Sequence, residues 1–201
     1  MTAAMWALQL LVPADRSLFP RVEAAIRGGV TLVQLREKDR PDGETYRVGR
    51  ELRDLVRRRG AAFFVNDRPD LALALEADGV HVGEGDLPVA TVRRIAPSLL
   101  IGMSCHDIPS AQMAAEADYI GFGPVFPTPS KDDAAAPTGP EMLRQVARQA
   151  RRPVVAIGGI GIATAAQLKG SGIAGVAVIS AILGAGDAEA AARELRHALG
   201  L

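Results

Sequence analysis

The chain has 201 residues, 48% of them hydrophobic and 23% charged, and its 23 basic and 23 acidic side chains leave no formal net charge. This composition supports a large buried core and provides no basic surplus for binding nucleic acid. The single Cys105 excludes an intramolecular disulfide, and no apolar run approaches the roughly 20 residues that cross a bilayer. We therefore expect a cytoplasmic protein without a signal peptide and with no nucleic-acid or membrane partner.

Short apolar segments alternate along the chain with segments of helical spacing. Strands are predicted at residues 7–12, 62–65, 79–83, 100–104, 119–125, 154–157 and 176–180. A further strand, the second along the chain, is predicted to start at residue 32. Helices are predicted at residues 20–27, 43–59, 69–77, 89–95, 110–117, 141–150, 163–169 and 188–199. The connection from 126 to 138 is long for a compact domain.

Eight strand–helix alternations with no linker predict a single domain over residues 1–201. A doubly wound open sheet is the alternative, but the first strand lacks the G-x-G-x-x-G turn of a dinucleotide fold. The second face of the strands carries glycine or polar residues, such as Gly121 and Ser104, as a crowded barrel interior requires. The predicted fold is therefore an α/β (β/α)8 TIM barrel, with its active site at the carboxyl ends of the strands.

The strand that starts at residue 32 has an unusual polar face. Its period of two places Gln34, Arg36 and Lys38 on one side and Val33 and Leu35 on the other. In a barrel this polar side points into an enclosed space, where an amide and two cations suit an anionic ligand. The alternative is a solvated edge strand whose cations pair with neighbouring carboxylates.

Two aspartates follow neighbouring strands. Asp67 and Asp86 can share one hard cation, because Mg²⁺ sites commonly use one or two carboxylates together with substrate phosphate. The alternative for either residue alone is helix N-capping, which Asp67 could do for the helix after it.

A second candidate anion site lies at the carboxyl ends of the last two predicted strands. Gly158 and Gly159 follow the seventh strand, and Ile179 and Ser180 end the eighth, where barrels of this kind hold a phosphate on backbone N–H groups. Two anion sites predict two phosphorylated substrates.

The histidines and the cysteine are weaker candidates. His81 and His106 could act as general bases, but His81 lies within a strand, which favours a hydrogen-bonded interior residue. Cys105 has no adjacent base on its own strand face, so a nucleophilic role is not expected.

Seven motifs at the predicted strand ends carry a family resemblance. They are residues 34–39 (QLREKD), 66–68 (NDR), 77–83 (ADGVHVG), 102–104 (GMS), 118–126 (DYIGFGPVF), 128–131 (TPSK) and 157–160 (IGGI). With these motifs in this order, the chain resembles the thiamine-phosphate synthase (thiamine-phosphate pyrophosphorylase) family over nearly its whole length.

The resemblance implies a transferase of thiamine biosynthesis that joins hydroxymethylpyrimidine diphosphate to hydroxyethylthiazole phosphate and releases pyrophosphate. It assigns the pyrimidine diphosphate to Gln34, Arg36, Lys38, Asn66, Ser104 and Lys131, and the thiazole phosphate to Thr128, Ser130, Gly159, Ile179 and Ser180. Asp67 and Asp86 would hold Mg²⁺. Among these residues Arg36, Lys38, Ser104 and Lys131 would be catalytic.

The family's reaction is thought to be dissociative, with the C–O bond to pyrophosphate breaking before the thiazole nitrogen attacks. Such a reaction needs leaving-group stabilisation and positioning but no protein nucleophile. The connection 126–138 would serve as a lid that excludes water.

Two departures from the family pattern stand out. Glu84 replaces the usual Gln after the fourth strand, and it would either tighten the metal site or face solvent. The first strand ends in residues 12–15 (VPAD) where a Thr-Asp pair is usual, which should matter little.

Three alternative functions are open. A related thiazole tautomerase carries a catalytic His where this chain has Pro124, a non-catalytic barrel would only bind thiamine precursors, and another phosphate-binding isomerase would not need the carboxylate pair. The sequence leaves homo-oligomerisation open.

Overall fold

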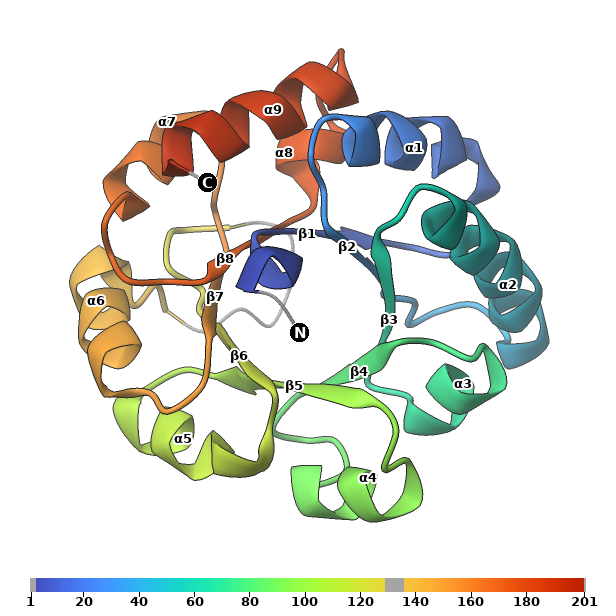
Figure 1. Cartoon of the computed structure of the whole chain (residues 1–201), viewed down its shortest axis with the longest axis horizontal. Coiled ribbons are helices and arrows are strands. Elements are labelled where there is room, and N and C mark those ends of the chain that lie inside the picture. The colour runs from blue at the N-terminus through green and yellow to red at the C-terminus, as the bar shows by residue number, and fades with distance from the viewer. Residues whose placement is uncertain (1–2, 129–135, 201) are drawn as a thin grey trace.

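The computed structural model describes residues 3–128 and 136–200. Eight parallel strands form a closed barrel in the order β1 to β8, with β1 paired to both β2 and β8. Helices surround the barrel on its outside (Figure 1). The predicted single-domain (β/α)8 TIM barrel is confirmed.

The strands lie close to their predicted positions. Their bounds are β1 Leu8–Val12, β2 Leu32–Leu35, β3 Ala62–Asn66, β4 Gly79–Val82, β5 Leu100–Cys105, β6 Tyr119–Phe122, β7 Val154–Ile157 and β8 Gly175–Val178. Three strands end earlier than predicted, β4 at Val82, β6 at Phe122 and β8 at Val178. The predicted end of the eighth strand is wrong because the carbonyl of Ile179 accepts hydrogen bonds from the N–H groups of Ile182 and Leu183, which starts a helix.

The helices have the bounds α1 Phe19–Arg27, α2 Asp42–Arg58, α3 Pro69–Ala74, α4 Val89–Ile95, α5 Ile108–Met113, α6 Gly139–Gln149, α7 Ile162–Ala165, α8 Ser180–Leu183 and α9 Ala188–Leu199. Short 3-10 helices cover Ala3–Trp6, Arg16–Leu18, Ala114–Glu116 and Ala166–Leu168. The predicted helices 110–117 and 163–169 each divide into an α-helix and a 3-10 turn. Neither α8 nor Ala3–Trp6 was expected from the sequence pattern.

Two apolar cores flank the sheet. The larger lies between the strands and the helices, where Val48, Leu52 and Val56 of α2 are buried as their helical spacing predicts. The smaller lies inside the barrel and consists of Trp6, Leu11, Leu32, Phe64, Tyr119, Val155 and Ala177. The 3-10 helix Ala3–Trp6 lies across the centre of the barrel (Figure 1), and the Trp6 ring stacks on Tyr119 with centroids 4.5 Å apart.

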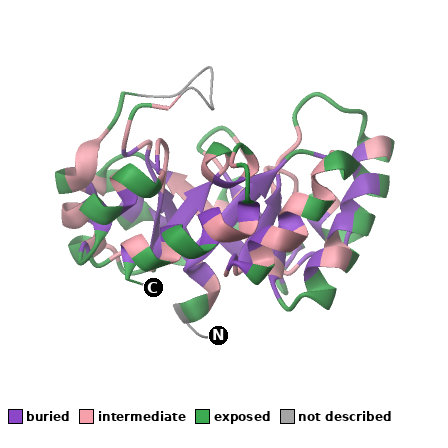
Figure 2. Ribbon diagram, turned by 90° about the horizontal axis from the view of Figure 1, so that it is seen from above, coloured by how far each residue is buried: buried purple, intermediate pink, exposed green. Residues whose placement is uncertain are grey.

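Glycines on β4 and β5 make room for these rings. A Cβ at Gly79 would lie 2.4 Å from the Phe64 ring, and one at Gly102 would lie 2.3 Å from the Tyr119 ring. Aromatic side chains therefore fill the amino end of the barrel, and the strands themselves are largely buried (Figure 2).

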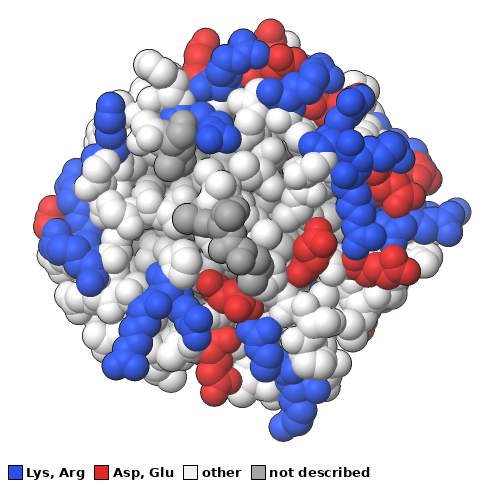
Figure 3. Space-filling model, in the orientation of Figure 1, with Lys and Arg blue, Asp and Glu red and all other residues white. Residues whose placement is uncertain are grey.

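Charged side chains of both signs gather over the surrounding helices on the face where the chain starts (Figure 3). Within residues 3–128 and 136–200, no helix is long and apolar enough to cross a membrane.

Candidate active site

A cavity of about 630 Å³ opens among the carboxyl ends of the strands. Its floor is formed inside the barrel by residues such as Leu11, Tyr119 and Val155, and its rim by the segments that follow the strands. Most of the residues predicted for the site line this cavity: Gln34, Arg36, Lys38, Asn66, Asp67, Asp86, Ser104, Thr128, Gly159, Ile179 and Ser180. The other two, Ser130 and Lys131, lie outside the described residues, as does most of the predicted lid.

The loop after β2 presents Arg36 and Lys38 to the cavity, and Glu37 fixes its shape. The Glu37 carboxylate accepts hydrogen bonds from the backbone N–H groups of Lys38 at 3.0 Å and Asp39 at 3.1 Å, and from that of Ala14 in the preceding βα loop at 3.0 Å. Burial alone would raise the pKa of Glu37, but these N–H donors lower it below its usual range. The sequence pattern suggested the carboxylates next to Arg36 and Lys38 only as ion-pair partners, because the acceptor role of Glu37 depends on contacts between loops.

Asp67 and Asp86 come together as predicted. Burial, and then a hydrogen bond and repulsion from Asp86, raise the pKa of Asp67 to about 6, although Lys38 and Arg36 oppose this. Asp86 also accepts a hydrogen bond from the Gly83 N–H at 2.6 Å. Two carboxylates this close repel each other unless they share a proton or a cation.

The capping alternative for Asp67 does not hold. Its backbone is in the left-handed region with φ 64°, its N–H donates to the His81 carbonyl, and the N-cap position of α3 belongs to Arg68. The side chain is therefore left for the cavity.

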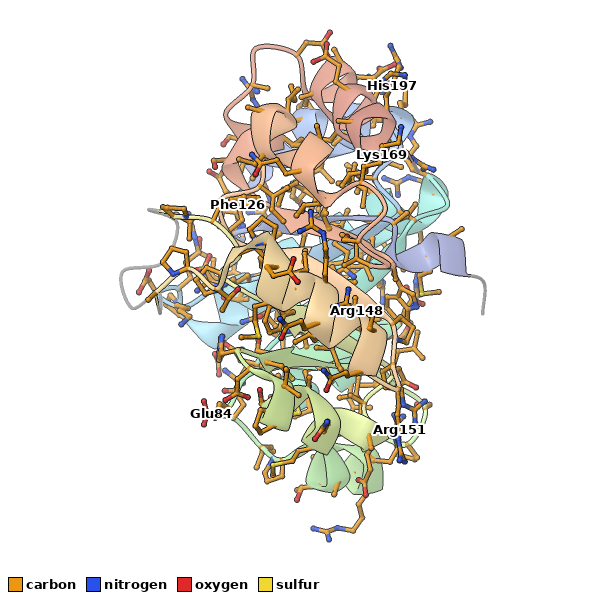
Figure 4. All side chains as sticks on the ribbon, turned by 90° about the vertical axis from the view of Figure 1, so that its left-hand side faces the viewer. Glu84, Phe126, Arg148, Arg151, Lys169 and His197 are labelled. Atoms are coloured by element: carbon orange, nitrogen blue, oxygen red, sulfur yellow. The ribbon has the colours of Figure 1, made fainter. Side chains whose placement is uncertain are left out.

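Glu84 does not join this pair. It is exposed, it is absent from the lining of the cavity, and Figure 4 shows it extending from the edge of the molecule. Across the described residues, no group of three or more Asp, Glu, His or Cys side chains is placed to hold a metal. The candidate donor set is two carboxylates, which suits a hard cation that also binds substrate phosphate and water.

A chain of hydrogen bonds crosses the cavity floor. His81 Nδ1 lies 2.7 Å from the Tyr119 hydroxyl, and Nε2 lies 3.0 Å from Ser104 Oγ. The Tyr119 hydroxyl also interacts with the side chain of Gln34. The prediction that His81 is a hydrogen-bonded interior residue is confirmed, and its ring orients Ser104. Sequence reasoning missed Tyr119, since only the register of β4 to β6 brings it to His81.

Glycines shape the opposite wall. Gly158 and Gly159 have φ values of 94° and 63°, and a Cβ at either would come within 2.5 Å of Pro124 or of the Pro127 carbonyl. This wall continues into Ile179 and Ser180 at the start of α8. Backbone groups therefore dominate this side, as in barrels that bind phosphate after strands seven and eight.

The remaining candidates have structural roles. The Nδ1–H of His106 donates to the Gly123 carbonyl, which fixes its ring at the rim. Cys105 is buried outside the cavity lining, and burial raises the pKa of its thiol to about 11. A thiol with this pKa is a poor nucleophile at neutral pH, in agreement with the sequence-based expectation.

The fold and the cavity define a (β/α)8 barrel with a paired carboxylate site at the carboxyl ends of its strands. The family described as thiamine monophosphate synthase matches residues 8–182. Thiamine-phosphate synthases of Chloroflexus aurantiacus and Pyrococcus furiosus are 47% and 46% identical, over 95% and 94% of this chain and 91% and 93% of theirs. A solved thiamine phosphate pyrophosphorylase from Pyrococcus furiosus has a TM-score of 0.89 at 41% identity, covering 98% of this chain and 97% of that one. The chain belongs to the thiamine monophosphate synthase family of transferases.

Proposed function

We propose that the chain joins hydroxymethylpyrimidine diphosphate to hydroxyethylthiazole phosphate, giving thiamine phosphate and pyrophosphate. The observation that supports this proposal is that one cavity has two walls of different composition, each of which suits an anion. Arg36 and Lys38 stand beside the carboxylate pair on one wall, and the glycine-rich backbone around Gly159 forms the other. Family membership supports the same reaction.

The two substrates are assigned to the two walls. Gln34, Arg36, Lys38, Asn66 and Ser104, with Lys131, would bind the pyrimidine diphosphate. Thr128, Ser130, Gly159, Ile179 and Ser180 would bind the thiazole phosphate. The assignments of Ser130 and Lys131 rest on the sequence motif alone.

The carboxylate pair fits Mg²⁺, because two oxygen donors lie close together in a partly buried site, where burial and then the neighbouring Asp86 raise the pKa of Asp67. Asp67 and Asp86 would hold the ion, which when bound would neutralise charge on the departing pyrophosphate.

The described side chains suit a dissociative transfer. The C–O bond to pyrophosphate breaks with its electron pair on the leaving oxygen, where Arg36 and Lys38 stabilise the negative charge. The pyrimidinylmethyl cation is then attacked by the lone pair of the thiazole nitrogen, so no protein nucleophile takes part. The floor formed by Ser104, His81 and Gln34 holds the ring in position.

Pyrophosphate release by the purified protein tests this function. We expect release that needs both substrates and Mg²⁺ and stops with EDTA. Isomerised thiazole phosphate without coupling would indicate the tautomerase, and binding without release would indicate a non-catalytic protein. Lys131→Ala should abolish release. A cytoplasmic location and homo-oligomerisation stay predictions.

A further inference from the structure

Gln9 on β1 is a buried amide with an unused donor. Its side chain is 1% exposed and lines the floor of the cavity. In residues 3–128 and 136–200, its Nε2 is the one buried side-chain nitrogen or oxygen without a hydrogen-bond partner. A buried N–H group without an acceptor lowers stability, so such a group calls for an explanation, and beside a cavity a water or a bound ligand can supply the acceptor.

The neighbours of Gln9 offer no acceptor. In the barrel register Gln9 pairs with Leu32 on β2 and Ala177 on β8, both with apolar side chains, and Leu11 is the next residue of β1 that lines the cavity. Gln34, the other amide on this floor, differs because it interacts with the Tyr119 hydroxyl. The acceptor for Gln9 must therefore come from the cavity.

The depth of Gln9 limits what this acceptor can be. Gln9 is level with Leu32, and Arg36 stands four residues further along the chain, about 13 Å at the rise of a strand. A diphosphate held by Arg36 and Lys38 at the strand ends is thus too far away, and an anion would be poorly solvated among Leu11, Leu32 and Ala177. A flat, neutral heterocycle attached to that diphosphate fits this position.

We infer that Gln9 is a specificity-determining residue whose Nε2–H donates a hydrogen bond to a ring nitrogen of the aminopyrimidine. This inference rests on the proposed function. Of the two substrates, the pyrimidine offers neutral ring acceptors that the reaction does not consume. The thiazole nitrogen is excluded as the acceptor because its lone pair forms the new C–N bond.

Gln9→Met tests the inference, because methionine has a similar length and no donor. We expect the KM for the pyrimidine diphosphate to rise about tenfold, the loss of one hydrogen bond, with the KM for the thiazole phosphate unchanged. The melting temperature of the ligand-free variant should equal or exceed that of the wild type, since an unsatisfied group has been removed. Gln112→Met, the same change at an exposed position of α5, is the matched control.

Two substrate analogues, each with one ring nitrogen replaced by C–H, test the same bond without relying on a variant. By calorimetry, one analogue should bind wild-type protein about tenfold more weakly than the natural substrate and bind Gln9→Met with no further loss. Binding of both analogues to the wild type as tightly as the natural substrate, a lower melting temperature of ligand-free Gln9→Met, or a selective rise in the thiazole phosphate KM would each overturn the inference. Failure of the proposed function looks different, because wild-type protein would then not release pyrophosphate; if it also fails to bind the pyrimidine diphosphate, the inference fails with it.

Discussion

The two ends of the barrel interior differ in the kind of side chain that fills them and in how those side chains interact. At the amino end Trp6, Phe64 and Tyr119 pack ring against ring, and glycines on the neighbouring strands give them space. At the carboxyl end two carboxylates crowd each other beside the cations of the β2 loop. The same strands thus gain stability from packing at one end and hold an electrostatically unfavourable arrangement at the other. This difference indicates that the amino end supports the fold and the carboxyl end is reserved for ligands.

Removing the aromatic packing should have the largest effect. We expect Trp6→Ala to lower the free energy of unfolding by about 3–5 kcal/mol, because it leaves a cavity under the Tyr119 ring. Urea denaturation measures this change, with the exposed Leu73→Ala as control. A loss below about 1 kcal/mol would show that the amino end does not support the fold.

Removing one carboxylate should have opposite effects on activity and stability. Asp67→Asn should lower turnover on the order of 100-fold, and asparagine tolerates the positive φ at this position. Without metal at pH 8, the variant should be more stable than the wild type by about 1 kcal/mol. The sign follows from the raised pKa: the carboxyl of Asp67 contributes stability only while it is protonated, and this contribution is lost as pH rises through about 6.

The pH dependence gives this prediction its control. The stability difference between Asp67→Asn and the wild type should vanish below about pH 4, where both side chains are neutral. Thermal melts across this range measure it, with the exposed Glu194→Gln for comparison. A variant that is less stable at pH 8 would mean that the pair is not repulsive.

Loosening the β2 loop should have a smaller effect. Glu37→Gln keeps the shape of the side chain but replaces one acceptor oxygen by a donor that faces backbone N–H groups. We expect kcat/KM for the pyrimidine diphosphate to fall about tenfold, since Lys38 loses its anchor. Steady-state kinetics would show this, and the exposed Glu194→Gln should behave like the wild type.

The smallest effect on turnover is expected from a substitution in the core between the strands and the helices. Cys105 belongs to the outer core, so Cys105→Ala should leave turnover within about twofold of the wild type. Its thiol should resist iodoacetamide in the native protein at pH 7.5 and react in urea, because the folded pKa is about 11. Fast alkylation of the native protein would contradict the buried position.

Local patterns were enough to predict the strands and most helices, because hydrophobic periodicity follows from which face is buried. They also placed Gln34, Asp67 and Asp86 correctly, since parallel strands bring their carboxyl ends to one edge. Contacts between distant segments were out of reach: Trp6 on Tyr119, and Glu37 on Ala14. Each contact depends on the barrel register or on the shape of a loop, and the spacing of residues in the sequence predicts neither.

The direction of the helices has a practical consequence. Because α9 runs back along the outside of the barrel, its end at Leu199 and the start of the described chain at Ala3 both lie on the side away from the carboxyl ends of the strands (Figure 2). A surface, a tag or a second protein joined at either terminus would attach to that side. The protein can thus be immobilised through either end with the mouth of its cavity facing solvent.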